Sequence, residues 1–513
     1  MNHEREQWGT RLGLILAVAG NAIGLGNFLR FPVQAAQNGG GAFMIPYLFS
    51  FLLLGIPLMW IEWTIGRYGG KHGHGTTPGM FHRMWSHPIS KYIGTLGIVI
   101  PILIGAYYIY VMSWSLGFAW YSLTGKLTQL TTPEQVKAFL EGYQGVVKNE
   151  YFTSQLPAYI FFLIAFLFTI YIVSRGVVKG IETLAKIAMP TLFILAVLLV
   201  IRVLTLGSPN PEHPEWSIDL GLGYMWNPRL ELLKSGKTWL AAAGQIFFTL
   251  SLGIGILQCY ASYLREKEDI VTAGLATAST NEFAEVILGG TIAIPAAVAF
   301  FGPALVKKVS GFDLAFQTLP LVFNHLPFGR VFSTAWFLLL FLAGVTSAVA
   351  LSQPFVAFLQ DEFGIPRKKA TVYLFFILFA LSQPVIFFLK YGFLNEIDFW
   401  MGTFALVIFA TSEVIIFNYL FGTDKGWEEL HIGAVLHLPK VFYYVMRYIT
   451  PIFLLSILVY WTVTDAVPTL LMKKYSPEQV PYIIAARLII VVVFVVFAYM
   501  VKVAWRKKGG VKA

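Results

Sequence analysis

The stretch GNAIGLGNFLRFP, residues 20–32, constrains this chain most, because it lies inside an apolar run over residues 12–36. About 20 apolar residues are enough for a helix to cross the ~30 Å hydrocarbon core of a bilayer. Glycine costs a helix about 1 kcal/mol relative to alanine, and Gly20, Gly24 and Gly26 fall within seven residues. The run therefore predicts a membrane helix that breaks near its centre.

A break at membrane depth exposes N–H and C=O groups, which is tolerated only where protein or a water-lined cavity satisfies them. The freed carbonyls suit a cation, and the N–H groups that start the second half-helix suit an anionic group. Asn27 adds a side-chain oxygen. The stretch therefore predicts a binding site, while a simple kink or a close helix crossing remains the alternative.

The composition is that of a membrane protein with many spans. Of 513 residues 57% are hydrophobic and 12% charged, against about 25% charged in soluble proteins. The single cysteine, Cys259, excludes an internal disulfide and a cysteine-based metal cluster. The net charge of +10 comes from Lys and Arg in short loops between apolar spans, a pattern that favours phospholipid head groups over nucleic acid as partners. No cleavable signal is expected, because the first apolar run is too long for one.

Twelve apolar runs predict twelve membrane spans. An even number puts both termini on one side, and Arg5 and Arg11 near the start match Arg506, Lys507 and Lys508 near the end. We expect both termini to be cytoplasmic. The runs are 12–36, 42–66, 92–122, 156–173, 185–205, 239–263, 270–300, 330–360, 371–389, 397–421, 442–464 and 480–504.

Three connections stand out on the opposite side. Residues 125–155 balance lysines against glutamates and predict a solvated external loop. Residues 206–238 are rich in proline and are expected to be external as well. Residues 301–329 are partly apolar but interrupted by proline and glycine, which predicts short helices folded into an external vestibule, where they could act as a lid.

The sixth span repeats the features of the first. Its centre, GQIFFTLSLGIGI at residues 244–256, combines polar residues with closely spaced glycines. Two units of five helices each must face opposite ways across the membrane, with discontinuous first helices that meet at the midplane. We expect a single transporter domain over residues 1–513. Its first repeat is 11–205, its inverted second repeat is 237–421, and two more helices follow at 440–505.

Several motifs resemble the neurotransmitter:sodium symporter family, and closely its bacterial amino-acid transporter LeuT. The resemblance covers almost the whole chain and implies an all-α polytopic protein of twelve membrane helices, with the LeuT fold, a 5+5 inverted repeat and discontinuous helices 1 and 6. It also implies a bacterial inner (plasma) membrane location. The motifs are GNAIGLGNFLRFP, NGGGAF at 38–43, IEW at 61–63, QIFFTLSLG at 245–253, NEFAE at 281–285 and AGVTS at 343–347.

The resemblance implies two sodium sites built from neutral oxygens, which bind sodium without holding it too tightly to release. In one site, the carboxylate of the substrate is itself a sodium ligand, and this couples sodium binding to substrate binding. The protein ligands of this site are Ala22, Asn27, Thr249 and Asn281. Those of the other are Gly20, Ile23, Ala343, Thr346 and Ser347. Membrane Ser and Thr hydroxyls more often bond their own helical turn, so the resemblance carries the last two assignments.

The resemblance also implies a zwitterionic amino acid between the half-helices, with neutral aliphatic or hydrophobic L-amino acids preferred. Its carboxylate would face the N–H groups of Leu25 and Gly26 and the Tyr108 hydroxyl, and its ammonium the carbonyls of Ala22, Phe248 and Thr249 and the Ser251 hydroxyl. An aromatic or other small zwitterionic substrate is the alternative. The expected substrate-binding residues are Ala22, Gly24, Leu25, Gly26, Ile104, Tyr108, Phe248, Thr249, Ser251, Ile254, Ser347 and Leu351.

Carboxylates at membrane depth are costly and mark function. Glu62 is expected to accept freed N–H groups of the broken sixth helix. Glu285 resembles the residue that replaces chloride in chloride-independent members, so no chloride requirement is expected. The resemblance pairs Arg30 with Asp398 through water in an outer gate above the site. It pairs Arg5 with Asp361 in an inner gate, near Trp8 and Tyr263. A homodimer is one assembly that the resemblance permits.

Two other classes of membrane protein are alternatives to a transporter. A membrane enzyme is disfavoured, because the sequence has no HExxH and no GxSxG elbow in a span. A channel or a non-transporting amino-acid sensor would also use buried polar groups, but a pair of inverted broken helices favours alternating access over a pore.

Overall fold

A computed structural model describes residues 6–306 and 314–509, and every regular element in these two ranges is a helix. In its first part the helices, with η marking 3₁₀ or π segments, are α1 Arg11–Ala22, α2 Leu25–Gln37, α3 Gly41–Ser50, η1 Phe51–Gly55, α4 Ile56–Lys71, α5 Thr77–Met84, α6 Ser90–Gly94, α7 Leu96–Leu123, η2 Leu127–Gln129, α8 Pro133–Tyr143, α9 Leu156–Ser174, η3 Val177–Glu182, α10 Thr183–Leu204, α11 Ile218–Trp226 and η4 Leu230–Lys234.

The second part begins with another broken helix. Its elements are α12 Gly236–Thr249, α13 Ile256–Ala261, α14 Ile270–Glu282, η5 Phe283–Gly289, α15 Gly290–Val306, η6 Leu314–Thr318, α16 Leu319–Asn324, α17 Gly329–Phe363, α18 Arg367–Phe387, η7 Leu389–Tyr391, α19 Phe393–Phe399, η8 Trp400–Phe404, α20 Ala405–Ile415, η9 Ile416–Gly422, α21 Thr423–His431, α22 Lys440–Tyr444, η10 Val445–Ile449, α23 Thr450–Trp461, η11 Thr462–Ala466, α24 Val467–Leu470 and α25 Val480–Gly509.

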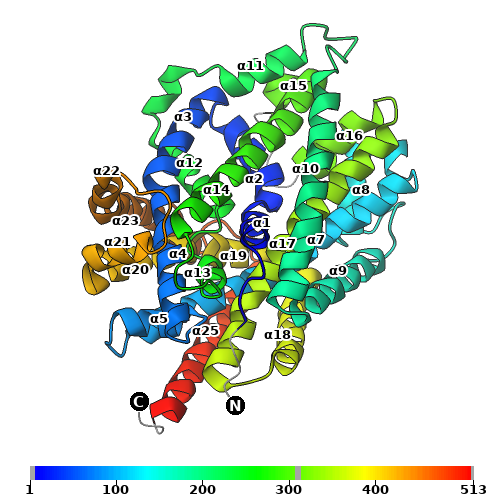
Figure 1. Cartoon of the computed structure of the whole chain (residues 1–513). Coiled ribbons are helices and arrows are strands. Elements are labelled where there is room, and N and C mark those ends of the chain that lie inside the picture. The colour runs from blue at the N-terminus through cyan, green and yellow to red at the C-terminus, as the bar shows by residue number, and fades with distance from the viewer. Residues whose placement is uncertain (1–5, 307–313, 510–513) are drawn as a thin grey trace.

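These helices account for the twelve predicted spans. Within the described residues ten continuous helical segments are long and apolar enough to cross a membrane, and the bent pair α1 and α2 makes an eleventh. The remaining predicted span, 239–263, corresponds to α12 and α13, each too short to cross alone. The two termini of the chain lie at the same end of the molecule, as the even number of spans predicts (Figure 1).

The first helix breaks where its glycines cluster. α1 ends at Ala22, α2 starts at Leu25, and their axes differ by 46°. Gly24 is extended, with φ −110° and ψ −166°, and its N–H donates to the Asn27 side chain over 3.0 Å. The predicted break is therefore confirmed, and a side chain of the next half-helix satisfies one of its free backbone groups.

The sixth span breaks between Thr249 and Ile256. Gly253 and Gly255 have φ of +68° and +95°, in the left-handed region that glycine adopts without strain. A Cβ on Gly253 would lie 2.3 Å from the carbonyl oxygen of Leu406, so only glycine fits there. The Gly253 N–H donates to Glu62 Oε1 over 2.7 Å, which confirms the predicted bracing of this break by Glu62.

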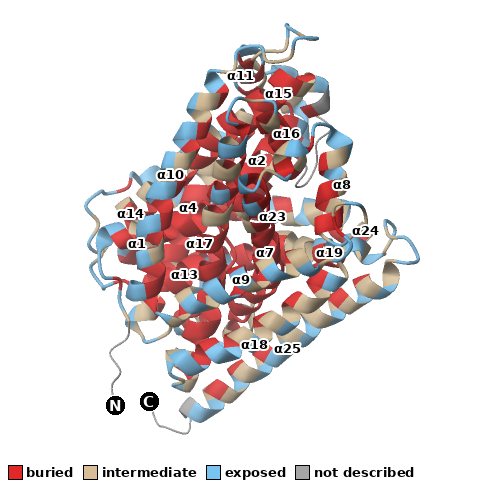
Figure 2. Ribbon diagram, turned by 90° about the vertical axis from the view of Figure 1, so that its right-hand side faces the viewer, coloured by how far each residue is buried: buried red, intermediate tan, exposed pale blue. Residues whose placement is uncertain are grey.

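The broken helices lie inside a scaffold of continuous ones. α7 and α17 make the most extensive helix pair in the described part of the chain. α1 packs against α10, α14 and α17, and α2 packs against α15. Buried residues fill this centre, whereas the long α25 on the outside presents mainly partly buried and exposed residues (Figure 2). Both breaks therefore lie in the middle of the bundle.

Two predicted external loops contain helices. In 125–155, α8 has buried Phe139, whose ring lies 5.6 Å from that of Phe118 on α7. The capping box of Thr132 and Gln135 at the start of α8 is a sequence signal for a helix, but the balanced charges of the segment predict a loop. In 206–238, α11 packs against α15. In 301–329, η6 and α16 are the short helices that were predicted, and residues 307–313 lie outside the described ranges.

Candidate functional site

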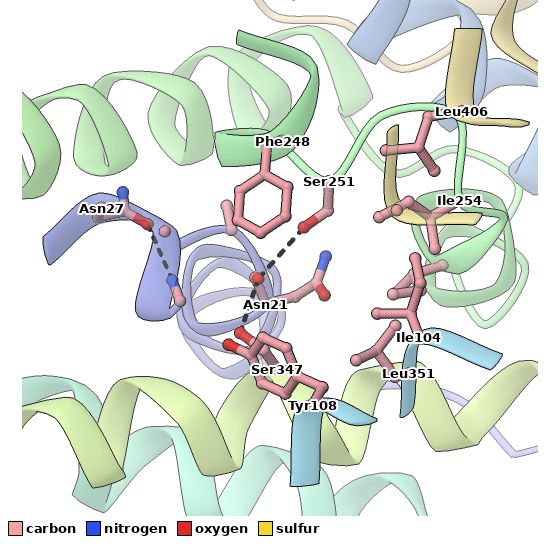
Figure 3. Close-up of a pocket in the computed structure, with 15 residues that line it drawn as sticks. Asn21, Asn27, Ile104, Tyr108, Phe248, Ser251, Ile254, Ser347, Leu351 and Leu406 are labelled. Atoms are coloured by element: carbon pink, nitrogen blue, oxygen red, sulfur yellow. Dashed lines mark hydrogen bonds between the residues drawn. The ribbon is translucent and has the colours of Figure 1, made fainter. Parts of the chain in front are cut away.

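Both breaks open onto one buried cavity. Helices α7 and α17 form one of its walls, and the segment from η8 to α20 contributes two more residues (Figure 3). Its lining consists of Asn21, Ala22, Gly24, Gly26, Asn27, Ile104, Tyr108, Phe248, Ser251, Ile254, Ile256, Ser347, Leu351, Gly402 and Leu406. Ten of these are among the twelve residues predicted for substrate binding. The other two, Leu25 and Thr249, are next to lining residues in sequence.

One side of the cavity is polar. The Leu25 N–H, at the start of α2, donates to the Tyr108 hydroxyl over 3.1 Å. The Ser251 and Ser347 hydroxyls donate to the carbonyl oxygen of Asn21 over 3.3 and 3.1 Å. Figure 3 shows these groups gathered around the end of α1. The polar side therefore combines the backbone carbonyl of Asn21 near the end of one half-helix with the N–H group that starts the next.

The other side of the cavity is aliphatic. Ile104, Ile254, Leu351 and Leu406 face one another across from the polar groups in Figure 3. A cavity with one polar and one aliphatic side fits a small molecule that is charged at one end and apolar at the other.

The Phe248 ring separates this cavity from a second one. The second, outer cavity is lined by Phe248, Arg30 and Asp398 among others, and the Arg30 guanidinium carbon lies 4.5 Å from the centre of the Phe248 ring. A Cβ on Gly26 would lie 2.4 Å from the same ring, so Gly26 permits the close approach of α2. Phe248 therefore packs against α2, where it contacts both the Arg30 guanidinium and the bare backbone of Gly26.

The residues of the first predicted sodium site form one hydrogen-bonded cluster. Asn27 Nδ2 donates to Asn281 Oδ1 over 2.8 Å, and both Asn27 and Asn281 donate to Thr249 Oγ1, over 3.2 and 2.9 Å. The Thr249 hydroxyl in turn donates to Glu285. The carbonyl of Ala22 accepts from the Gly24 N–H over 2.9 Å at the nearby break. The sequence placed the four predicted ligands and Glu285 in three separate spans, and the fold brings them together.

Glu285 lies fully buried behind this cluster. Besides Thr249, it accepts from Gln245 Nε2 over 3.0 Å and from the Tyr47 hydroxyl over 2.8 Å. A buried carboxylate needs several donors or a cation to offset its lost hydration. Three donors converge on Glu285, and the predicted cation site lies beyond one of them.

The residues of the second predicted sodium site join α1 to α17. The Ser347 hydroxyl lies 3.2 Å from the Ala343 carbonyl oxygen and 3.5 Å from that of Gly20. The Thr346 hydroxyl donates to Ala343 over 3.0 Å. A Cβ on Gly20 would lie 3.2 Å from that of Thr346, so the two helices approach closely. Ile23, the fifth predicted ligand, directly follows the end of α1.

Neither a salt bridge nor a direct hydrogen bond is found between the predicted outer gate residues, Arg30 and Asp398, both of which lie in the described ranges. Asp398 Oδ1 accepts from the Tyr107 hydroxyl over 2.6 Å, while Arg30 lies over Phe248. Both line the outer cavity. Their predicted pairing through water stays a prediction.

At the inner end, Trp8 Nε1 donates to the Tyr260 carbonyl over 3.0 Å, and the Trp8 N–H to that of Tyr263 over 3.4 Å. Arg5 lies outside the described residues, so its pairing with Asp361 near the end of α17 also stays a prediction.

Two tethers of the N-terminal segment were not predicted. Arg367 Nε and Nη2 donate to the two carboxylate oxygens of Glu6 over 2.9 and 3.0 Å. Glu182, on η3, accepts from the Gly9 N–H over 2.8 Å and from the Thr10 hydroxyl over 2.7 Å. The sequence placed all five residues in loops or at span ends and carried no signal that they meet.

Sequence reasoning also missed Asn21. This residue is 2% exposed, lines the cavity, and neither polar atom of its side chain has a hydrogen-bond partner among the described residues. Its position inside the first glycine cluster was a usable signal. Ile256, Gly402 and Leu406 were missed as well, because an apolar or small residue in a membrane helix usually packs against its neighbours or lipid.

Two membrane helices broken at the same buried, amphipathic cavity define a secondary transporter. A comparison with protein-family models identifies which one. Residues 5–162 and 153–507 match the sodium:neurotransmitter symporter family, and the chain belongs to this family. The members of this family are transporters and not enzymes, and the predicted fold and membership are confirmed.

Relatives agree with this assignment. An uncharacterized sodium-dependent transporter of Methanocaldococcus jannaschii is 33% identical over 97% of this chain and 98% of its own length. A sodium-dependent neutral amino acid transporter of Rattus norvegicus is 26% identical over 93% of this chain and 87% of its own. The solved structure of MhsT in complex with L-phenylalanine is similar with a TM-score of 0.76 and 30% identity, over 89% of this chain and 99% of that one.

Proposed function

We propose that this protein is a sodium-coupled symporter that takes up neutral, aliphatic or hydrophobic L-amino acids by alternating access and does not require chloride. The observation that carries this proposal is the cavity between the two breaks, with helix-end backbone on one side and an aliphatic wall on the other. A zwitterion with an apolar side chain matches both sides.

The polar side supports one orientation of the substrate. The N–H groups at the start of α2 and the Tyr108 hydroxyl favour the carboxylate, because the N-terminus of a helix carries partial positive charge. The ammonium faces the end of α1 and the backbone after α12, where carbonyls and the Ser251 hydroxyl accept hydrogen bonds. The substrate side chain then lies against Ile104, Ile254 and Leu351.

Two clusters of neutral oxygens support two sodium ions. In the first, the carbonyl of Ala22 and the side chains of Asn27, Thr249 and Asn281 bind sodium together with the substrate carboxylate. In the second, the carbonyls of Gly20, Ile23 and Ala343 and the hydroxyls of Thr346 and Ser347 bind the other ion. Sodium entry requires these hydroxyls to turn away from the carbonyls to which they now donate. Substrate and sodium then stabilise the same closed arrangement of half-helices.

Chloride independence is supported by Glu285. Two sodium ions add two positive charges to a site of low dielectric, and a zwitterion compensates neither. Glu285 is one bonded side chain away from the first sodium site. Its fixed negative charge offsets part of the cost of occupancy, which is the role that an anion would otherwise have.

A wider range of substrates is the alternative, supported by one relative. The similar protein MhsT was solved in complex with L-phenylalanine. A pocket with branched Ile104 and Ile254 opposite the polar groups favours aliphatic side chains over aromatic ones. The shape of this aliphatic wall therefore sets the relative affinities for aliphatic and aromatic substrates.

The remaining parts of the proposal concern assembly and orientation. Arg30 and Asp398 form the outer gate. Arg5 and Asp361, with Trp8 and Tyr263 nearby, form the inner gate. Both termini face the cytoplasm, the membrane is the bacterial inner membrane, and a homodimer is the proposed assembly.

A competition assay tests the substrate class. Purified protein in sealed vesicles takes up radiolabelled leucine in the presence of each common amino acid in turn. We expect leucine, methionine and alanine to compete best, and acidic or basic amino acids to lose by several kcal/mol, because their side-chain charge would be buried unpaired. Phenylalanine as the best competitor would favour the alternative, and glutamate or lysine would overturn the proposed orientation.

A further inference from the structure

A groove on the outside of the bundle lies between α9, η3 and α18, away from the transport site. α9 and α18 pack against each other on the right-hand side of the lower half of the molecule in Figure 1. Both are membrane helices, and only 33% and 39% of their most apolar windows are buried. Their outer faces are therefore surfaces that lipid covers.

The upper part of the groove is apolar and aromatic. Tyr171 from α9 and Val372, Phe375 and Phe376 from α18 line it. Tyr171, Val372 and Phe376 are 57%, 53% and 63% exposed, although they belong to membrane helices. At this depth such side chains contact the hydrocarbon of the membrane rather than water.

The lower part of the same groove is cationic. Arg175 and Lys179 follow the end of α9, and Lys368 lies in the first turn of α18. All three are exposed, and the ion pairs found within residues 6–306 and 314–509 include none of them. The nearby carboxylate of Glu6 already binds Arg367 with both oxygens. Three positive charges thus meet at the point where the hydrocarbon-facing surface ends.

We propose that this groove binds an anionic glycerophospholipid, with its phosphate among Arg175, Lys179 and Lys368 and an acyl chain against Tyr171 and Phe376. The charges and the apolar surface are complementary to the two ends of one lipid molecule. Basic side chains beside a membrane helix attract anionic head groups, and Arg and Lys both bind phosphate oxygens with charge-assisted hydrogen bonds. This site rests on the membrane-spanning fold and is independent of the proposed substrate.

The test counts bound lipid on the full chain. Purified protein in detergent is titrated with dioleoylphosphatidylglycerol, and bound lipid is counted by native mass spectrometry. Relative to the wild type, the variant Arg175→Gln/Lys179→Gln/Lys368→Gln is expected to need about tenfold more lipid for half-saturation, since it loses three charges at the membrane surface.

A matched control removes the same charge elsewhere. Arg83, Lys267 and Lys425 are also exposed cations, and none of them lines this groove. Their triple replacement by Gln should leave lipid binding within twofold of the wild type, a margin we set for non-specific attraction. An equal loss in both triple variants would overturn the proposal, because general charge would then explain the binding.

Three further controls distinguish specific lipid binding from misfolding, from apolar binding and from binding of free phosphate. The charge-conserving variant Arg175→Lys/Lys179→Arg/Lys368→Arg should retain the lipid, so misfolding cannot imitate the result. Dioleoylphosphatidylcholine, with the same chains but no net charge, should bind weakly. Inorganic phosphate should not displace the phosphatidylglycerol. Unchanged binding in the glutamine variant, equal binding of phosphatidylcholine, or complete displacement by inorganic phosphate would each contradict the site.

Discussion

The N–H of Leu25, the first residue of α2, donates to the hydroxyl of Tyr108 on α7 over 3.1 Å. This bond joins the second half of the broken helix to the scaffold at the polar side of the cavity. These two groups are the ones proposed to bind the substrate carboxylate. The carboxylate must therefore replace the hydrogen bond that now joins them, or share its donors. Tyr108 thereby both closes the break and contributes to the binding site.

The substitution Tyr108→Phe removes the hydroxyl and little else. A hydrogen bond to a charged group contributes about 1.5–3 kcal/mol, so we expect the substrate affinity to fall roughly 10- to 100-fold. Equilibrium binding of radiolabelled leucine measures this. Leucinamide, which lacks the carboxylate, is the control ligand, and its weak binding should not change. An unchanged leucine affinity would remove Tyr108 from the carboxylate site.

The double substitution Thr346→Ala/Ser347→Ala removes two of the five proposed oxygens of the second sodium site. The sodium concentration for half-maximal substrate binding should rise severalfold, or sodium-dependent binding should disappear. Ser352→Ala, on the same helix, is the control, because its hydroxyl bonds only its own turn over 2.9 Å. If sodium dependence stayed at the wild-type value in the double variant, the assignment would be wrong.

Gly26→Ala tests whether the close approach of α2 to Phe248 is required. The new Cβ would lie 2.4 Å from the ring, so the ring must move into one of the two cavities. We expect leucine uptake to be lost while the protein still purifies as a folded species. Gly105→Ala on α7 is the control, because its Cβ would meet nothing closer than 3.5 Å. Normal uptake by the Gly26 variant would show that the ring position is unimportant.

Glu62→Leu tests the bracing of the second break. It leaves the Gly253 N–H, now bonded over 2.7 Å, without an acceptor. A buried unsatisfied donor costs about 1–3 kcal/mol, so the thermal unfolding midpoint should fall. Glu62→Gln keeps an acceptor oxygen and should lose less stability. Equal midpoints for the two variants would mean that the bond contributes little.

Replacing chloride by gluconate should leave wild-type uptake unchanged if Glu285 has its proposed role as the fixed negative charge. Glu285→Ser should make uptake dependent on chloride, since it removes that charge and opens room for an anion beside Asn281 and Thr249. Glu285→Gln removes the charge but keeps the volume, so it should be weakly active in either anion. The account fails if wild-type uptake collapses without chloride, or if the serine variant stays active and indifferent to it.

Much of the fold could be predicted because membrane helices follow simple physical rules. Twenty apolar residues span a bilayer, so the twelve runs gave helices close to the observed ones, and the glycine clusters located both breaks. α8 and α11 were not predicted. Short surface helices have no such length requirement, and their capping residues are equally common in turns.

The residues of the candidate site were predictable mainly where a motif carried them. Asn27, Thr249 and Asn281 meet in the structure because the motifs that contain them lie on three helices that cross at the breaks. Leu406 and the Glu6–Arg367 pair depend on packing between distant segments. No local pattern records such packing, so the structure was needed to find them.

Concentrative uptake is the most direct test of sodium-coupled symport by this protein. The full chain in sealed vesicles, with sodium outside and potassium inside, is given radiolabelled leucine. The account predicts that internal leucine rises above the external concentration, that choline in place of sodium abolishes the rise, and that a sodium ionophore added at the peak releases it. Leucine that only equilibrates, or that accumulates equally without sodium, would contradict the proposed symport.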